Sequence, residues 1–296
     1  MPIQNILTID VEDYFQVTNF EVDIRREDWP SFPSRVVDST RRLLRLLAEG
    51  DVRATFFVLG YVAEHHPQLV REIDAAGHEI GSHSYWHRLI YNLTPAEFRQ
   101  DLRRSRDVLQ DLLGKPVTAF RAPSFSITNR SQWALEILAE EGFTVDSSVF
   151  PIYHNRYGIP DAAPYPVAHE FPAGQLWEFP LSVCRLGHRV NLPISGGGYF
   201  RLLPIGITEK LLRYVNESTN RPFVFYIHPW EFDPEQPRVR AGTWLQRFRH
   251  YVNLTKTESK FERLLGSFRF GRLDQAVAQL IGAQDRSDIQ SLTLST

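Results

Sequence analysis

Short apolar runs alternate with amphipathic segments through most of the chain, and this alternation is the strongest constraint on its fold. The runs have the length of buried strands, and the amphipathic segments repeat their apolar residues with helical spacing. The expected strands are residues 3–9, 54–59, 79–80, 117–120, 143–149, 177–181 and 222–227. The expected helices are residues 35–48, 67–73, 94–112, 133–141 and 207–215, with further helix beyond Gly242. Because such repeats form parallel βαβ units, the sequence predicts an α/β fold, either a barrel or an open doubly wound sheet.

The composition excludes several classes of protein. The chain has 296 residues, 43% of them hydrophobic, so it can bury a large core. Its 33 basic and 35 acidic residues give a net charge of −2 without a long basic run, which argues against nucleic-acid binding. Cys184 is the single cysteine, which excludes a cysteine-rich zinc site. No signal peptide is visible and no apolar run reaches about 18 residues, so we expect a cytoplasmic protein without a membrane span.

Polar side chains follow four of the expected strands. They are Asp10, Glu12 and Asp13 after the first strand, His83 and His87 after the third, Arg121 after the fourth and His228 after the last. Because parallel strands end at one edge of a sheet, these side chains are candidates for one site. His83 and His87 stand at i and i+4, so on one helical turn both imidazoles could share a cation. Such a pair also occurs on solvated helix faces, and the partners elsewhere in the chain must decide.

These residues lie in motifs that resemble those of the polysaccharide deacetylases of the NodB-homology type, carbohydrate esterase family four. In chain order, the five motifs resemble Leu7-Thr-Ile-Asp10, His83-Ser-Tyr-Trp-His87, Arg121-Ala-Pro-Ser-Phe125, Asp146-Ser-Ser-Val-Phe150 and Phe225-Tyr-Ile-His228. Order and spacing agree over roughly the first 230 residues. The combination is far more specific than any one motif.

The resemblance implies a distorted (β/α) barrel that holds a divalent metal with one carboxylate and two histidines. The metal is usually zinc, with cobalt and nickel as alternatives, and it activates the attacking water. Asp10 would then be the general base, held by Arg121, and His228 would protonate the departing amine. Asp146 would fix the charge or tautomer of His228.

The chain departs from the common family pattern at its first motif. That pattern has two adjacent aspartates, the second of which is the metal ligand, whereas here Val11 follows Asp10. The arrangement resembles a subgroup that includes Helicobacter-type peptidoglycan deacetylases and allantoinase-like members, in which the ligand lies two residues after the base. Residues 10 and 12 point the same way on a strand, which favours Glu12 as the ligand and leaves Asp13 as the alternative.

The rest of the chain predicts parts of the site less directly. Residues 150–180 are expected to form a long surface connection, and the Ser-Gly-Gly-Gly stretch at 195–198 is expected to form a flexible turn. Phe125, Tyr199 and Trp230 are candidates for stacking on sugar rings, with core packing as the alternative.

We expect two parts in the chain, a catalytic domain at 1–235 and a C-terminal helical extension at 236–296 that packs on the barrel. The extension contains a basic and aromatic stretch at 247–254 and Phe268-Arg-Phe-Gly271. It resembles the extension of deacetylases associated with exosortase and PEP-CTERM exopolysaccharide clusters.

The function that the resemblance implies is metal-dependent removal of N-acetyl groups from amino sugars of an exopolysaccharide or its precursor. One alternative is hydrolysis of another linear or cyclic amide, as in the allantoinase-like members, and a second is a saccharide-binding module without turnover. The expected partner is an N-acetylated oligo- or polysaccharide, and the sequence leaves room for a homo-oligomer.

Overall fold

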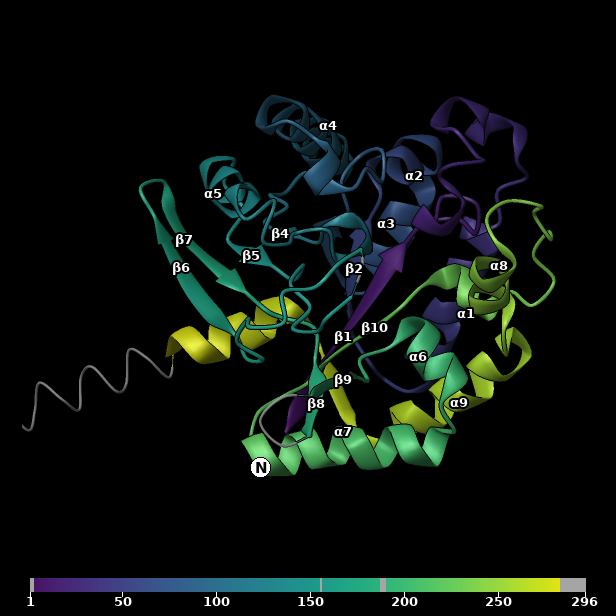
Figure 1. Cartoon of the computed structure of the whole chain (residues 1–296). Coiled ribbons are helices and arrows are strands. Elements are labelled where there is room, and N and C mark those ends of the chain that lie inside the picture. The colour runs from purple at the N-terminus through teal and green to yellow at the C-terminus, as the bar shows by residue number, and fades with distance from the viewer. Residues whose placement is uncertain (1–2, 155, 187–189, 283–296) are drawn as a thin grey trace, which may run out of the picture.

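The computed structural model describes residues 3–154, 156–186 and 190–282, and a mainly parallel β-sheet forms its centre (Figure 1). The strands are β1 (Gln4–Val11), β2 (Thr55–Val58), β3 (Glu79–Ser82), β4 (Ala119–Phe120), β5 (Val145–Asp146), β6 (Val167–Phe171), β7 (Gly174–Glu178), β8 (Val183–Leu186), β9 (Val190–Pro193), β10 (Val224–Ile227) and β11 (Arg269–Gly271). The main sheet runs in the order β10-β1-β2-β3-β4-β5-β7-β6, β11 pairs with β1, and β8 and β9 form a separate antiparallel ribbon. The predicted α/β class is therefore confirmed.

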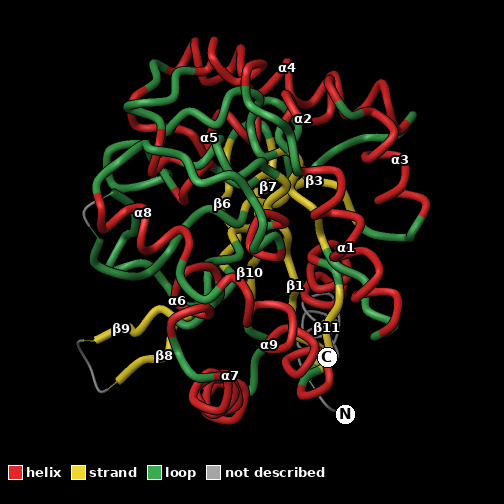
Figure 2. Tube along the Cα trace, turned by 90° about the vertical axis from the view of Figure 1, so that its right-hand side faces the viewer, coloured by secondary structure: helices red, strands yellow, loops and turns green. Residues whose placement is uncertain are grey.

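Helices surround this sheet, as the red and yellow segments of Figure 2 show. They are α1 (Val36–Glu49), α2 (Gly60–His65), α3 (Pro67–Ala75), α4 (Pro95–Leu113), α5 (Trp133–Glu140), α6 (Gly197–Leu202), α7 (Ile205–Thr219), α8 (Trp244–Tyr251) and α9 (Leu254–Ser267). The predicted helices correspond to α1, α3, α4, α5 and α7, with α8 and α9 beyond Gly242. The short helices α2 and α6 were not predicted.

Helix α4 shows why local sequence predicted these elements well. Thr94 and Glu97 form a capping box at its first turn, and Pro95 occupies the first helical position. The helix ends at Gly114, whose φ of 65° is the left-handed conformation that glycine adopts readily. Start and stop signals within the segment itself therefore set both ends of α4.

The sheet curves into an incomplete barrel. Alternate side chains of β2 point into two different cores: Phe56 packs with the outer helices, and Phe57 packs in an inner cluster. That inner cluster also contains Val224 of β10 and Trp177 of β7, so strands near the two opposite ends of the sheet contribute to one interior. In the described residues no strand pair closes the gap between β7 and β10. The Val224 amide instead donates to the Ser182 hydroxyl, and the Tyr226 amide donates to the Ser195 carbonyl.

Three predicted segments differ in the structure. The stretch at 150–180 is not only a connection, because β6 and β7 form an antiparallel hairpin in it. Residues 269–271, predicted as part of a helical extension, form β11 and pair with β1. The glycines at 196–198 are not a flexible turn, since a Cβ on Gly196 would lie 1.8 Å from the Tyr226 carbonyl oxygen. The β11 pairing and the contact of Gly196 come from distant parts of the chain, whereas the hairpin pairs two strands that are neighbours in sequence.

Candidate metal and catalytic site

The polar residues that follow the strands converge at one edge of the sheet. Strands β10, β1, β2, β3 and β4 are consecutive neighbours and run parallel, so their carboxyl ends lie side by side. Asp10 lies within β1, Arg121 directly follows β4, and His228 directly follows β10. All three side chains are largely or fully removed from solvent, with His228, 16% exposed, the most open.

Glu12, His83 and His87 form a compact cluster beside them. One potential ligand atom from each residue lies within 4.8 Å of the others, and all three residues are buried. Nδ1 of His83 bonds the Arg121 carbonyl oxygen at 2.8 Å, which leaves Nε2 of this ring to face the cluster. A backbone carbonyl that fixes a histidine in this way is the usual support of a metal ligand.

The two histidines do not lie on a helical turn, so that part of the sequence prediction was wrong. They follow β3 in an irregular loop in which Ser84 and His87 have φ values of 65° and 52°. Backbone N–H groups of Tyr85 and Trp86 donate to the buried Asp101 carboxylate of α4 and hold the loop. The rings still approach each other, with centroids 5.3 Å apart.

The donor set fits a divalent cation. Oε2 of Glu12 lies 2.7 Å from Nε2 of His87 without the alignment of a hydrogen bond, so this buried oxygen has no donor in the described residues. Burial opposes ionisation, yet the neighbouring His87 lowers the pKa of Glu12 to about 2. Burial also lowers the pKa of His83 to about 4, which favours the neutral imidazole that binds metals. One carboxylate and two imidazoles suit zinc and related cations.

Asp13, the alternative ligand, has a different role in the structure. Its carboxylate accepts hydrogen bonds from the backbone amide of Arg35 at 3.0 Å and from the hydroxyl of Ser34 at 2.6 Å. It also accepts from the amide of Val36, the first residue of α1. Asp13 therefore anchors the start of α1 to the end of β1, and Glu12 is the carboxylate of the cluster.

Arg121 holds Asp10 as the sequence predicted. Nη1 of the fully buried guanidinium donates to Oδ1 of Asp10 at 2.9 Å. The same guanidinium donates to the carbonyl oxygen and hydroxyl of Ser147, and it lies over the ring of Phe57. These contacts fix one oxygen of Asp10 and leave Oδ2 on the side of His228, whose Nε2 is 3.9 Å away.

Glu231, not Asp146, is the carboxylate that holds His228. Its Oε1 accepts from Nδ1 of His228 at 2.7 Å, and its Oε2 accepts from Nε of Arg201 at 2.5 Å. Burial would lower the pKa of His228, but the hydrogen bond and charge of Glu231 raise it to about 9. Glu231 lies in the 3-10 turn Pro229–Phe232, three residues after the histidine, so the chain supplies this partner locally.

Asp146, predicted as the partner of His228, instead faces Glu178. The two residues are neighbours in register on β5 and β7, and their carboxyl groups hydrogen-bond each other. Burial and the charge of Asp146 raise the pKa of Glu178 well above its usual value. The remaining oxygens accept from the Ser148 hydroxyl and from the Val149 amide. Asp146 thus braces the loop that carries Ser147, which in turn binds Arg121.

Two of the three candidates for sugar stacking are unsuitable for that role. Trp230 is 6% exposed, stacks on His228 and His250, and donates its indole N–H to Oε1 of Glu12 at 3.2 Å. Phe125 is also 6% exposed and packs among the aromatic rings of the inner cluster. Tyr199, in α6, is only partly buried and remains a candidate.

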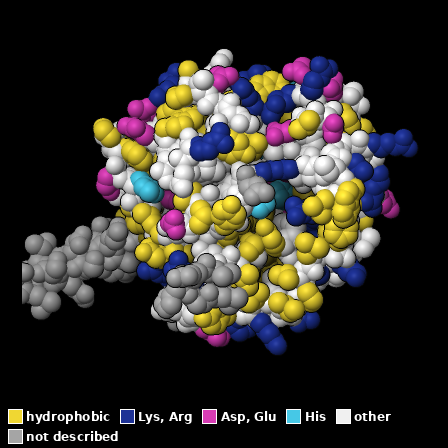
Figure 3. Space-filling model, in the orientation of Figure 1, with side chains coloured by type: hydrophobic (Ala, Val, Ile, Leu, Met, Phe, Trp, Pro, Cys, Tyr) yellow, Lys and Arg dark blue, Asp and Glu magenta, His cyan; other side chains and the backbone are white. Residues whose placement is uncertain are grey.

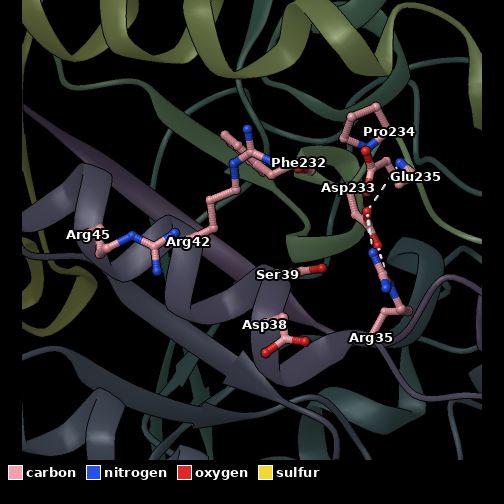
Figure 4. Close-up of a pocket in the computed structure, with 9 residues that line it drawn as sticks. All are labelled: Arg35, Asp38, Ser39, Arg42, Arg45, Phe232, Asp233, Pro234 and Glu235. Carbon is pink, nitrogen blue, oxygen red and sulfur yellow. Dashed lines mark hydrogen bonds and ion pairs between the residues drawn. The ribbon is translucent and has the colours of Figure 1, made fainter.

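A separate cavity of about 380 Å³ lies between α1 and the residues that follow Glu231 (Figure 4). Three arginines and three acidic residues line it, and Arg35 pairs with Asp233 at 2.7 Å across it. None of the residues of the metal cluster lines this cavity. Its balanced charge gives it no preference for an anion or a cation.

Comparison with known families divides the chain near residue 146. Residues 27–145 match the polysaccharide deacetylase family, and residues 147–278 match a domain of unknown function, DUF3473. The chain carries a polysaccharide deacetylase domain. The deacetylase match contains His83, His87 and Arg121, whereas Asp10 and Glu12 lie before it and His228 lies in the DUF3473 match.

Curated relatives agree with this assignment. A peptidoglycan-N-acetylglucosamine deacetylase from Bacillus cereus is 32% identical over 117 residues, 39% of this chain and 41% of that protein. A peptidoglycan deacetylase from Helicobacter pylori is 32% identical over 121 residues, 40% of each chain. The aligned part thus spans about two fifths of the length of these relatives.

Solved deacetylase-like structures share the fold. A putative polysaccharide deacetylase from Mycobacterium smegmatis superposes with a TM-score of 0.61 at 19% identity and covers 96% of both chains. PuuE allantoinase superposes with a TM-score of 0.57 at 15% identity, over 91% of this chain and 86% of that one.

Among the residues that the structure describes, no helix has the length and apolar character needed to cross a membrane.

Sequence reasoning missed Arg201, Glu231 and the supporting role of Trp230. The His-Pro-Trp-Glu sequence at 228–231 contained a usable signal, because an acidic residue three positions after a histidine can fold back onto it across a tight turn. No local signal linked Arg201 to Glu231, which is 30 residues away.

Proposed function

We propose that the protein is a metal-dependent hydrolase that removes N-acetyl groups from amino sugars of an exopolysaccharide or its precursor and releases acetate. The observation that carries the proposal is the convergence of three functional groups at one sheet edge. They are the Glu12, His83 and His87 cluster, the Asp10–Arg121 pair and the His228–Glu231 pair. The deacetylase family match over 27–145 supports the same reaction.

Glu12, His83 and His87 would hold the metal, and zinc is the first choice for this donor set, with cobalt and nickel as alternatives. When bound, a divalent cation polarises the amide carbonyl and lowers the pKa of water. Trp230 supports the ligand set, since its indole N–H donates to Oε1 of Glu12. That hydrogen bond orients the carboxylate while Oε2 stays free to bind.

Asp10 is placed to act as the general base. Its Oδ1 is held by Arg121 at 2.9 Å, so Oδ2 is the oxygen that can take the proton of the attacking water. The buried guanidinium also compensates the negative charge of Asp10 in a site with little solvent. Arg121 thereby fixes the orientation of the base.

His228 is placed to act as the general acid. With Nδ1 donating to Glu231, the cationic ring carries its second proton on Nε2, which lies 3.7 Å from Oε1 of Glu12 and 3.9 Å from Oδ2 of Asp10. A pKa of about 9 keeps this ring protonated at neutral pH. The proton on Nε2 would pass to the sugar nitrogen as the carbon–nitrogen bond breaks.

We propose a catalytic domain of residues 1–235 and a C-terminal extension of residues 236–296, of which 283–296 lie outside the described part of the chain. Side chains from the extension reach the site, because His250 of α8 stacks on Trp230 with ring centroids 4.2 Å apart. The extension therefore supports the residues around His228 and Glu12.

The test combines metal analysis with a product assay. Purified protein should contain about one equivalent of divalent metal per chain. It should release acetate from N-acetylglucosamine oligomers, and chelation should abolish this release until zinc is restored. Acetate release that survives both chelation and the Asp10→Asn substitution would contradict the proposal. Metal binding without acetate release would exclude this reaction and direct attention to another amide.

A further inference from the structure

Helix α8 exposes an apolar face. Trp244, Leu245 and Phe248 are 71%, 40% and 51% exposed, although each is a large apolar side chain. At 3.6 residues per turn these three positions lie on one side of the helix, next to the exposed Arg249. We call these four residues the α8 face. Adjacent exposed apolar side chains of this size usually mark an interaction surface.

The opposite side of α8 is firmly attached to the protein. His250 is buried, stacks on Trp230, and its Nε2 lies 2.8 Å from Oε1 of Gln236. Thr243 and Gln246 form a capping box at the first turn. The exposure of Trp244 and Phe248 is therefore not the result of a loosely packed helix.

The chain around α8 is strongly basic, although the whole protein has a net charge of −2. Residues 236–257 contain no aspartate or glutamate, and their basic residues are Arg238, Arg240, Arg247, Arg249 and Lys256. Asp23 is the acidic neighbour, and it accepts a hydrogen bond from the Gly242 amide. Figure 3 shows a yellow patch bordered by dark-blue side chains where Figure 1 draws α8.

We propose that the α8 face docks the protein on an anionic lipid surface. Tryptophan, leucine and phenylalanine on one side of a helix insert at the boundary of headgroups and acyl chains, and flanking arginines attract the acidic headgroups. Leu245 would add little to the binding of a sugar polymer, and the positive charge around α8 would repel the same face of a second protein molecule. A helix of 8 residues lies in the interface and does not cross it.

Docking would also place the catalytic site near the lipid. The buried side of α8 reaches Trp230 through His250, and Trp230 stacks on His228 with centroids 5.2 Å apart. Two side chains thus separate α8 from the proposed general acid. If the proposed deacetylase function holds, the substrate class is a saccharide attached to, or held close to, a lipid.

The test is co-sedimentation of the full chain with vesicles of phosphatidylcholine alone or with added phosphatidylglycerol. The wild-type protein should sediment with the anionic vesicles and dissociate at high salt. The double variant Trp244→Ser/Phe248→Ser should bind at least about tenfold more weakly, and the charge variant Arg238→Gln/Arg240→Gln/Arg249→Gln should show a similar loss. Ile207→Ser/Tyr214→Ser is the matched control, because it removes two exposed apolar side chains of α7.

Several results would overturn the docking proposal. They are equal binding of the α8 double variant and the wild type, no preference for the anionic vesicles, and a wild-type dimer that the double variant abolishes. Binding to a soluble amino-sugar polymer that the double variant loses would also overturn it, in favour of a saccharide surface. Acetate release from soluble oligomers should be unchanged in the double variant, so failure of the proposed reaction and failure of docking are separate results.

Discussion

Two regions of the same sheet edge bury carboxylates equally deeply and leave them in opposite states. Glu12, after β1, is 3% exposed, and Glu178, at the end of β7, is 4% exposed. Burial opposes ionisation of both, but His87 lowers the pKa of Glu12 to about 2, whereas Asp146 raises the pKa of Glu178 well above its usual value. Burial alone therefore does not decide the charge of a carboxyl group here. The nearest partner decides it.

The difference matches what each region does. Glu12 faces two histidines and can bind a cation, and Glu231, which lies between Arg201 and His228, follows the same pattern. Asp146 and Glu178 accept hydrogen bonds from Ser148 and Val149 and hold the backbone beyond β5. The carboxylates that face cationic or imidazole groups therefore lie in the candidate site, while the Asp146–Glu178 pair holds the loop after β5.

The largest effect should come from the carboxylate that takes the proton. We expect Asp10→Asn to lower kcat by about 10³-fold, because an amide cannot act as a general base. Metal content should stay at the wild-type level, since the cluster residues are unchanged. Steady-state acetate release and elemental analysis measure the two quantities. Asp51→Asn, at an exposed turn, is the control, and a wild-type rate in Asp10→Asn would remove the proposed base.

Glu231→Gln tests whether a charged partner matters beyond its hydrogen bond. The amide oxygen can still accept from Nδ1 of His228, so we expect orientation to persist while kcat falls about 10- to 100-fold. Without the charge of Glu231, the pKa of His228 should drop from about 9. Because the acid form is the active one, the rate should then decline at a lower pH than in the wild type. If the rate of Glu231→Gln declined at the same alkaline pH as that of the wild type, the role given to the charge of Glu231 would be wrong. Glu235→Gln, which changes an exposed glutamate, is the control.

The Asp146–Glu178 pair should respond differently from Glu12 and Glu231. Glu178→Gln replaces one hydrogen-bond donor with another, so we expect the free energy of unfolding to change by less than about 1 kcal/mol at neutral pH. Glu178→Ala leaves Asp146 buried without its partner and should cost about 3 kcal/mol. Urea denaturation distinguishes these cases. Equal losses for the two variants would mean that the pair is ionised.

The smallest effect should come from Glu141, which arginines surround near the surface. Burial opposes ionisation, but hydrogen bonds from Arg103 and Arg99 lower its pKa to about 2, from 4.5. A lowered pKa adds stability above pH 4.5 that is lost as the pH falls toward 2. Because the arginines are partly exposed, the contribution should be only about 1 kcal/mol. In an acid titration, Glu141→Gln should not show this loss of stability, whereas Glu140→Gln should show it.

Local sequence predicted the elements whose ends are marked within a few residues. The capping box at Thr94 and the stop at Gly114 fix α4, and apolar runs fix β1, β2 and β10. The resemblance to the subgroup, with support from strand alternation, favoured Glu12 over Asp13, and the structure places Glu12 in the cluster. Strand β11 was not predicted because its partner β1 lies at the other end of the chain, and β6 was missed although its partner β7 follows it directly.

The sequence by itself determined the α/β class and the polar residues that follow strands whose ends parallel pairing brings to one edge. The family resemblance added the Asp10–Arg121 pair and the choice of Glu12, His83 and His87 as candidate ligands. Only the tertiary structure decided which carboxylate serves His228 and what Trp230 supports. Glu231 lies three residues after His228, so the sequence offered it as a partner, but the exclusion of Asp146 depends on distances across the sheet. Such distances are set by packing, as the contact from Arg201 to Glu231 shows, and a linear pattern does not contain them.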